Sequence, residues 1–262
     1  MTLGGATPTM AGMHWLARIA AALFIAAIPV LLITSNVRFL AGEARFYDRG
    51  FREHDSAERT GLPLSELDRA GRDIIAYFED DRQRLNILVN DEGDEVALFS
   101  AKETQHMEDV KGLMRGVFRL NEISIAYVLV YVTGVFLWAG AGGLRRLALL
   151  SLGGIAVGVG VTAIVGVFAV TGFDAMWTRF HEIAFNNDLW QLNPDTDRLI
   201  QMFPEPFWEE ATYIVGALTL AEALLVVVAS VATLVLAKER PPAAAPEIVR
   251  VRPERRRRAS GD

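Results

Sequence analysis

Two histidines in this sequence stand in settings that suit proton transfer. His181 lies in the aromatic segment Phe180 to Trp208, FHEIAFNNDLWQLNPDTDRLIQMFPEPFW, and His106 precedes Asp109 by three residues, so a helix would place both on one face. An imidazole titrates near neutral pH and can serve as a general acid or base, and a nearby carboxylate can orient it. Each histidine also has a structural interpretation, His181 as a hydrogen-bonded loop residue and the His106 pair as a solvated helix face.

The composition narrows the possible chemistry. The sequence has no cysteine and four histidines, which excludes thiol nucleophiles, disulfides and thiolate metal sites. Neither His106 nor His181 has a second histidine at His-x-x-x-His or similarly short spacing, which favours acid/base chemistry over a zinc site. We therefore expect no metal and no cofactor.

The polypeptide has the composition of a membrane protein, because 52% of its residues are hydrophobic and its mean hydropathy is positive. Four apolar runs are long enough to cross a hydrocarbon layer of about 30 Å, which takes about 20 helical residues. The first run is longer than an ordinary signal-peptide core and lacks a clear cleavage site, which favours a transmembrane helix.

We expect an all-α membrane protein with four transmembrane helices, a small α+β extracytoplasmic domain between the first two, and an aromatic lid between the last two. In chain order, the expected segments are a cytoplasmic N-terminus (1–14), transmembrane helix 1 (15–37), the extracytoplasmic domain (38–120), transmembrane helix 2 (121–139), a cytoplasmic turn (140–146), transmembrane helix 3 (147–171), the extracytoplasmic lid loop (172–210), transmembrane helix 4 (211–237) and a disordered basic cytoplasmic tail (238–262).

Local patterns predict the elements that position the histidines. Apolar residues at helical spacing predict a helix near residues 65–81, opened by Ser65 and Asp68 as a capping pair. The runs LNILV and EVALF on either side of DEGD predict a hairpin of two short strands. Ser100 and Glu103 have capping-box spacing and predict the start of the helix that carries the first histidine toward the second span.

Two features of the later spans concern packing within the membrane. The third span has a small residue at every fourth position, Gly154, Gly158, Thr162 and Gly166, which predicts close approach of another helix. The fourth span carries Glu222, whose burial costs about 2.5 to 3.5 kcal/mol on insertion scales. We expect this carboxyl group to be protonated and hydrogen-bonded to a Thr or Tyr, or else to be functional.

The charge distribution predicts the orientation of the chain. Arg145 and Arg146 in the second connection, together with the arginine-rich tail, predict that both lie in the cytoplasm, because cytoplasmic loops are enriched in Lys and Arg. Residues 172–210 contain eight acidic residues and two arginines, which places them outside, with both histidines on the extracytoplasmic face and both termini inside. Anionic lipid headgroups and topology explain the arginine run better than nucleic acid does, so no nucleic-acid partner is expected.

Two segments resemble the signature segments of the lipoprotein intramolecular transacylase family. They are FSAKETQHMEDVK, which ends at Lys111, and the segment Phe180 to Trp208; the cluster of Tyr47, Gly50 and Phe51 is similar too. The resemblance implies transfer of an acyl chain from the sn-2 position of a diacylglyceryl lipoprotein to the amino group of its N-terminal cysteine. It also implies that His106 and His181 are the essential histidines, with the lipoprotein and membrane lipid as partners.

This reaction requires the removal of a proton from the incoming ammonium, protonation of the leaving alkoxide and stabilisation of an oxyanion. His106 and His181 would divide the two proton transfers, and a lysine, an asparagine or a backbone amide would stabilise the oxyanion. The expected supporting residues are Asp109, Lys111, Asn187 and Trp190. The alternatives are a lipid-ester hydrolase that uses water as the acceptor and a non-enzymatic sensor or scaffold with an extracytoplasmic binding domain.

The orientation can be tested with reporter fusions. We expect fusions at Gly143 and at the C-terminus to report the cytoplasm, because these sites adjoin the basic segments, and fusions at Gly93 and Asn193 to report the outside. A Gly143 fusion that reports the outside would invert the assignment and move both histidines to the cytoplasmic face.

Overall fold

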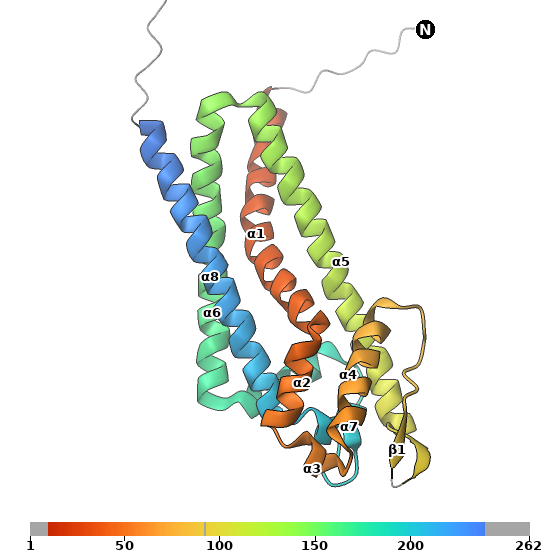
Figure 1. Cartoon of the computed structure of the whole chain (residues 1–262). Coiled ribbons are helices and arrows are strands. Elements are labelled where there is room, and N and C mark those ends of the chain that lie inside the picture. Colours follow the sequence, from red (N-terminus) through yellow and green to blue (C-terminus); the bar gives the residue numbers. More distant parts are fainter. Residues whose placement is uncertain (1–9, 92, 239–262) are drawn as a thin grey trace, which may run out of the picture.

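The computed structural model describes residues 10–91 and 93–238, which form a bundle of long helices with a smaller unit at one end (Figure 1). Over these residues, the four long helices are α1 (Met10–Gly42), α5 (Ala101–Trp138), α6 (Gly140–Ala184) and α8 (Glu205–Lys238). All four are long and apolar enough to cross a membrane. The chain is therefore a multi-pass membrane protein, as the sequence predicted.

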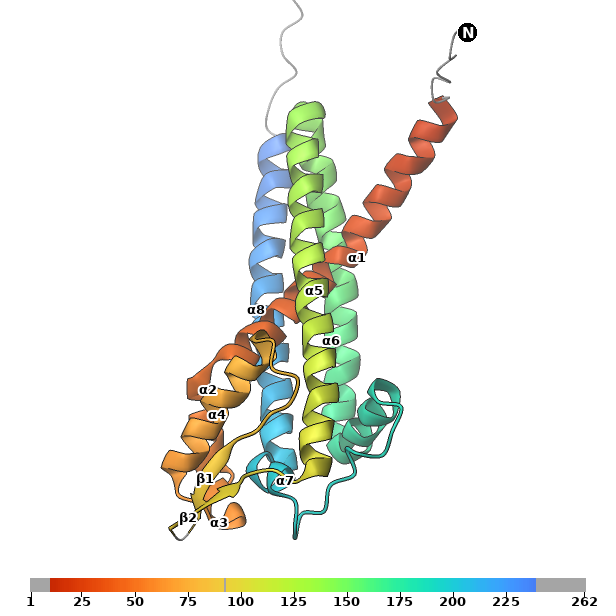
Figure 2. The same ribbon diagram turned by 90° about the vertical axis from the view of Figure 1, so that its right-hand side faces the viewer.

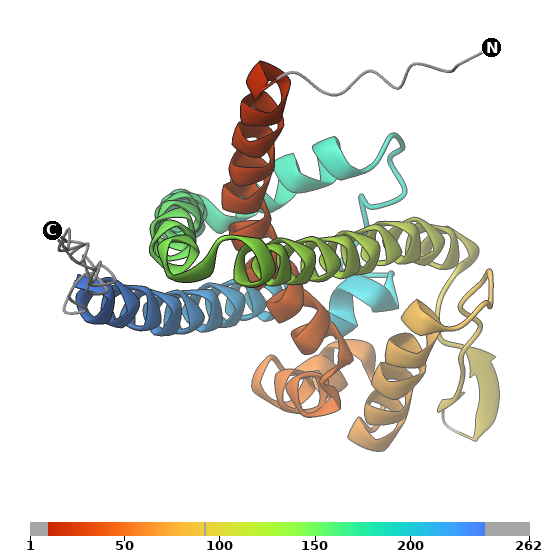
Figure 3. The same cartoon turned by 90° about the horizontal axis from the view of Figure 1, so that it is seen from above.

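Two of these helices extend well beyond the hydrocarbon layer. The 38 residues of α5 span about 57 Å, nearly twice the thickness of that layer. Its charged first half, up to Arg119, which carries His106, therefore extends beyond the hydrocarbon layer. The helical geometry of α6 is interrupted at Gly172, and residues 173–184, here called the lid helix, continue in another direction (Figure 3). His181 lies on this lid helix.

The smaller unit, residues 43–100, is called the outer unit. It contains α2 (Ala44–Glu53), α3 (Ser56–Thr60), α4 (Leu64–Glu79), β1 (Leu88–Asp91) and β2 (Asp94–Ala97). The strands pair antiparallel with Asp91 opposite Asp94, so the predicted hairpin is confirmed. In Figure 2 the outer unit lies on one side of α5 and the lid helix on the other.

The outer unit shares its hydrophobic core with the segment that follows the lid helix. The buried residues Tyr47 and Phe51 of α2 contact Phe203 and Phe207, which adjoin the short helix α7 (Arg198–Met202) and the start of α8. Tyr47 and Phe203 meet edge to face with ring centroids 6.0 Å apart, a favoured arrangement of aromatic rings. This core therefore connects chain segments about 150 residues apart.

The predicted helix in the outer unit exists, but its predicted cap is wrong. α4 begins at Leu64 after Pro63, whose carbonyl oxygen accepts hydrogen bonds from the backbone N–H groups of the first turn. Ser65 lies inside this turn, and the carboxylate of Asp68 binds Arg52 of α2 at 3.0 Å. Asp68 therefore holds α2 against α4 and does not cap the helix.

The segment boundaries differ from those expected at two connections. Residues 140–146, expected to form a turn, are the first residues of α6, and the break between α5 and α6 is at Ala139. Residues 172–210, expected to form a loop, contain the lid helix, α7 and the first turn of α8. Helical structure satisfies backbone hydrogen-bonding groups close to the membrane, where exposed ones are costly.

The small residues of α6 pack against two different helices. A Cβ atom on Gly154 would lie 2.9 Å from Ile28, and one on Gly158 would lie 3.1 Å from Pro29, so α1 approaches α6 closely at both positions. One turn further along α6, Thr162 faces Gly216 of α8. The predicted close packing is confirmed at these positions, whereas a Cβ on Gly166 would meet no atom within 4 Å.

Glu222 forms a hydrogen bond within the membrane, but not with the expected partner. Its carboxyl Oε2 accepts a hydrogen bond at 3.0 Å from the side-chain amide of Asn36 on α1, which is also 3.1 Å from the hydroxyl of Thr219. The expectation of a Thr or Tyr partner was therefore wrong. Asn36 is a better donor, because its NH₂ group has two hydrogens for these two acceptors.

The described ends of α1 and α8 lie at the same end of the bundle as the α5–α6 connection, opposite the outer unit (Figure 1). This arrangement agrees with both termini lying on one side of the membrane, and the identity of that side stays a prediction. The expected disordered tail lies outside the described residues from residue 239 onward, as do residues 1–9 of the expected N-terminal segment.

Gly50 provides a test of the contact between α2 and α8. A Cβ atom on Gly50 would lie 2.6 Å from the ring of Phe207, which is 1% exposed and packs against the rings of Phe46, Phe51 and Phe203. We expect Gly50→Ala to destabilise the fold by about 1 to 3 kcal/mol through overpacking, measured as a lower melting temperature in detergent.

The matched control is Gly112→Ala on α5, where a Cβ would meet no atom within 4 Å. This change should preserve or raise the melting temperature, because alanine is a better helix former than glycine. Equal melting temperatures for both variants would contradict the proposed contact.

Candidate active site

The structure brings His106 and His181 together from separate helices. Their ring centroids are 6.1 Å apart, and the residues are 5% and 8% exposed, respectively. His106 projects from α5, which the capping box of Ser100 and Glu103 opens as predicted, and His181 projects from the lid helix. The two imidazoles therefore face one another at the outer end of the bundle.

A backbone hydrogen bond fixes the tautomer of His181. Its Nδ1 lies 2.8 Å from the carbonyl oxygen of Trp177, one turn earlier on the lid helix. Because a carbonyl oxygen can only accept, Nδ1 carries the hydrogen. In the neutral ring, Nε2 therefore keeps a lone pair that can accept a proton.

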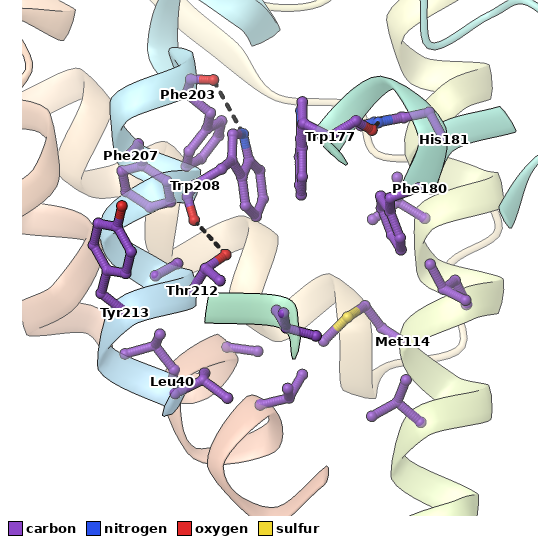
Figure 4. A pocket seen from close by; sticks show the side chains of 18 of the residues that line it. Leu40, Met114, Trp177, Phe180, His181, Phe203, Phe207, Trp208, Thr212 and Tyr213 are labelled. Carbon is purple, nitrogen blue, oxygen red and sulfur yellow. Dashed lines mark hydrogen bonds between the residues drawn. The ribbon is translucent and has the colours of Figure 1, made fainter. Parts of the chain in front are cut away.

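Aromatic side chains surround the His181 imidazole. Its ring centroid is 4.7 Å from that of Trp177, 5.6 Å from that of Phe185 and 5.1 Å from that of Trp190. Trp177 in turn stacks on Trp208 of α8 at 4.9 Å (Figure 4). Trp190 thus packs against the ring, and these aromatic side chains shield it from water.

The expected pairing of His106 with Asp109 is absent. The carboxylate Oδ2 of Asp109 accepts a hydrogen bond at 2.9 Å from the side-chain amide of Asn187 in the lid. Among the described residues, the buried Nδ1 of His106 has no hydrogen-bond partner. Asp109 therefore fastens the lid to α5 and does not orient the imidazole by a hydrogen bond.

Burial keeps both imidazoles neutral at pH 7. Desolvation and, to a lesser extent, repulsion from a charged His181 lower the pKa of His106 to about 4, against the smaller opposing effect of Asp109. Desolvation also lowers the pKa of His181, although its bond to the Trp177 carbonyl acts in the opposite direction. Two neutral rings are available as proton acceptors.

Glu103 connects the helix of His106 to the lid. This residue is 2% exposed, and one carboxylate oxygen accepts the backbone N–H of Ser100 at 2.8 Å while the other accepts that of Leu199 in α7 at 2.6 Å. The neighbouring Lys102 donates to the carbonyl of Gln191 at 2.6 Å. The start of α5 is therefore anchored to the lid at two consecutive residues.

Two of the expected oxyanion donors have other partners. The ammonium group of Lys111 lies 3.2 Å from the carboxylate of Asp80 and 3.9 Å from the ring centroid of Tyr77, on the side of α5 that faces the outer unit. The side-chain amide of Asn187 binds Asp109. Neither side chain lines the cavity beside the histidines.

A cavity of about 1200 Å³ opens beside the two histidines and continues between α1, α5, α6 and α8. Its walls are mainly aliphatic and aromatic, and Figure 4 shows Trp177, Phe180 and Trp208 near His181, with Leu40 and Met114 further along. The volume exceeds the usual range for drug-sized ligands, about 300 to 1,000 Å³. Its dimensions and apolar lining suit long hydrocarbon chains.

Within the described residues, no three His, Cys, Asp or Glu side chains are arranged to hold a metal ion.

The roles of two residues, Trp177 and Glu103, in the site were not identified from the sequence. Trp177 precedes His181 by four residues, so helical spacing contains a signal for this contact. The bond from Glu103 to Leu199 has no such signal, because it joins residues 96 positions apart.

The depressed pKa of His106 predicts how stability depends on pH. The folded value is about 4 and the ordinary value 6.5, so the unfolded state binds an extra proton between them. The free energy of unfolding therefore contains a contribution from the neutral, buried His106, which is fully present above pH 6.5 and is lost as the pH falls toward about 4. We expect His106→Gln to reduce the decrease in melting temperature across this interval.

The control is His14→Gln, because His14 is exposed near the far end of α1. This variant should retain the wild-type slope of melting temperature against pH. Parallel curves for wild type and His106→Gln would contradict burial of a neutral His106.

The comparisons with known proteins agree with this architecture. The family model for the lipoprotein intramolecular transacylase Lit matches residues 22–208. An uncharacterized protein of Aquifex aeolicus (strain VF5) is 29% identical over 130 residues, which are 49% of this chain and 54% of that protein. The chain therefore spans about half the length of this curated relative.

Solved structures show the same fold. The lipoprotein intramolecular transacylase Lit from Bacillus cereus aligns with a TM-score of 0.73 and 16% identity over 87% of this chain and 100% of its own. A variant of it with a histidine replaced by arginine aligns with a TM-score of 0.68 and 16% identity over 86% and 95%. Because the family model extends from the first transmembrane helix to the start of the fourth, the chain belongs to the lipoprotein intramolecular transacylase family of membrane acyltransferases.

Proposed function

We propose that this protein moves the sn-2 acyl chain of a diacylglyceryl lipoprotein to the amino group of the lipoprotein's N-terminal cysteine, with His106 and His181 as its acid/base groups. The observation that carries the proposal is the pair of buried imidazoles, 6.1 Å apart, at the head of an apolar cavity that extends between the transmembrane helices. Family membership supports the class of reaction. The charge pattern of the loops supports an active site on the extracytoplasmic face.

His181 is the base that prepares the nucleophile. A free α-amino group has a pKa of about 7.7 to 8.0, so the incoming amine is largely protonated at pH 7 and cannot attack. The Nε2 lone pair of His181 accepts one proton from it, because the Trp177 carbonyl holds the hydrogen on Nδ1. This proton later passes to water.

His106 moves the second proton from nitrogen to oxygen. Attack of the amine on the ester carbonyl forms the C–N bond and gives a tetrahedral intermediate whose nitrogen carries a proton to be lost. His106 accepts this proton and delivers it to the sn-2 oxygen as the C–O bond breaks. Its pKa of about 4 suits this role, because a protonated His106 releases its proton readily. The products are an N-acyl group and a lyso-glyceryl group.

The surroundings of the histidines favour an amine over water as acceptor. The aromatic rings around His181 and the apolar lining of the cavity exclude water, while an acyl chain in the cavity keeps its ester beside the imidazoles. Since Lys111 and Asn187 have other partners, we assign the oxyanion donor to a backbone amide. No cofactor takes part in the proposed reaction.

Substitution of the two histidines tests the proposal. We expect His106→Ala and His181→Ala each to reduce formation of N-acylated lyso-lipoprotein by about 10² to 10⁴, because each removes a proton-transfer group. The double variant should be no worse than the worse single variant, since residues that act as a unit are not additive. The measurement is mass spectrometry of lipoprotein N-termini in a strain that lacks the gene and is complemented with each variant.

The control is His54→Ala, because the imidazole of His54 binds Glu210 at 3.1 Å and does not line the cavity. It should retain the product. Wild-type product levels in both His106→Ala and His181→Ala would refute the assignment and favour the binding-protein alternative, whereas release of free fatty acid in place of N-acylation would identify a hydrolase.

A further inference from the structure

From the histidines, the cavity extends deep into the transmembrane bundle, away from the outer unit. Its lining reaches Val117 on α5, Val159 on α6 and Leu220 on α8, each the position furthest from the outer unit on that helix. At its head, the buried Nδ1 of His106 has no partner among the described residues, so this nitrogen is available to a polar group of a ligand. A ligand with a polar head and a long apolar chain fits both ends.

Close helix contacts end the cavity at its inner limit. Gly158 of α6 packs against Pro29 of α1, because a Cβ atom on Gly158 would lie only 3.1 Å from the side chain of Pro29. On α8, a Cβ atom on Gly216 would lie 3.7 Å from the side chain of Thr162. One turn nearer the lid, Gly166 also lines the cavity, but a Cβ there meets no protein atom within 4 Å. Helices α1 and α6 are therefore in close contact up to Gly158, and the cavity lining on α6 begins next to this contact, at Val159.

The distance from the histidines to this limit can be estimated from helix geometry. Eleven residues separate His106 from Val117 and thirteen separate Phe207 from Leu220, which correspond to about 16 and about 20 Å at 1.5 Å per residue. An extended chain advances about 1.2 Å per bond, judged from about 3.3 to 3.6 Å for the three backbone bonds of one residue. The cavity therefore accommodates a chain of roughly 13 to 16 bonds.

We propose that the inner part of this cavity, which includes Thr162, Gly166 and Gly216 and ends at Val159 and Leu220, limits the length of the acyl chain that the protein accepts from a diacylglyceryl lipopeptide. This inference rests on the proposed function and adds a specificity determinant to it. Gly166 is the decisive position, because its missing side chain leaves the passage open. A Cβ atom there would meet no protein atom within 4 Å, so a larger side chain has room to enter the space of the terminal carbons.

The test compares Gly166→Leu with wild type on two synthetic diacylglyceryl lipopeptides, one with octanoyl and one with palmitoyl chains. We expect the ratio of kcat/KM for palmitoyl to that for octanoyl to fall at least about tenfold in the variant. Each methylene group that an apolar pocket can no longer hold lowers kcat/KM for the longer substrate by about tenfold or more. The octanoyl substrate should be transferred nearly as well as by wild type.

The matched control is Gly160→Leu on the same helix. A Cβ on Gly160 also meets no atom within 4 Å, but this residue is exposed and does not line the cavity. Its substrate ratio should stay within about twofold of wild type. An unchanged ratio in a folded Gly166→Leu variant would overturn the proposal, and so would an equal fall in Gly160→Leu.

A second readout does not depend on catalysis. A palmitoyl lipopeptide with a diazirine at the end of its acyl chain should crosslink to residues 159–166 and 216–220 in wild type and Gly160→Leu, but not in Gly166→Leu. If wild type transfers no acyl chain yet crosslinks there, the proposed function fails and the length limit survives. Crosslinks elsewhere, or crosslinks that excess phosphatidylglycerol abolishes, would indicate a general lipid groove and overturn the length limit.

Discussion

The carboxylate of Glu103 is the interaction on which the geometry of the site depends. It is buried, and its two oxygens accept one backbone N–H at the start of α5 and another at the start of α7. Hydrogen bonds from backbone N–H groups to a carboxylate are charge-assisted and stronger than neutral ones. The bonds join the helix of His106 to the segment that follows the lid helix of His181, so two parts of the chain that could diverge at the outer end of the bundle are held in one arrangement.

This arrangement also accounts for the environment of the imidazoles. Once the lid is fastened, Trp177, Phe185 and Trp190 enclose His181, and the lack of water lowers the pKa of both histidines. A polar partner for His106 would have stabilised the fold but would also have occupied the nitrogen. Its Nδ1, which has no partner within the part of the chain that the structure describes, is available to a polar group of a substrate. Aromatic packing at the site thus serves folding and proton chemistry together.

The transmembrane helices contribute through the change in their spacing along the bundle. Where Gly154 and Gly158 adjoin α1, the helices are in close contact, and the bond between Asn36 and Glu222 connects α1 to α8. Nearer the outer unit, α6 turns aside at Gly172, and the core formed by Phe203 and Phe207 ties the start of α8 to the outer unit. The helices therefore enclose an apolar cavity in the half of the bundle next to the histidines, where an acyl chain and its ester meet the site.

The sequence alone determined the features that depend on local pattern. Hydrophobic length predicted the four membrane helices, turn residues predicted the hairpin, and Ser100 with Glu103 predicted the start of α5, because each signal involves residues close together in the chain. The two histidines were selected from residue type and motif. Only the tertiary structure decided which side chains meet: Asp109 binds Asn187, Lys111 binds Asp80, and Glu222 binds Asn36. These contacts join helices distant in sequence, and side chains at helical spacing share a face without specifying which neighbour that face will contact.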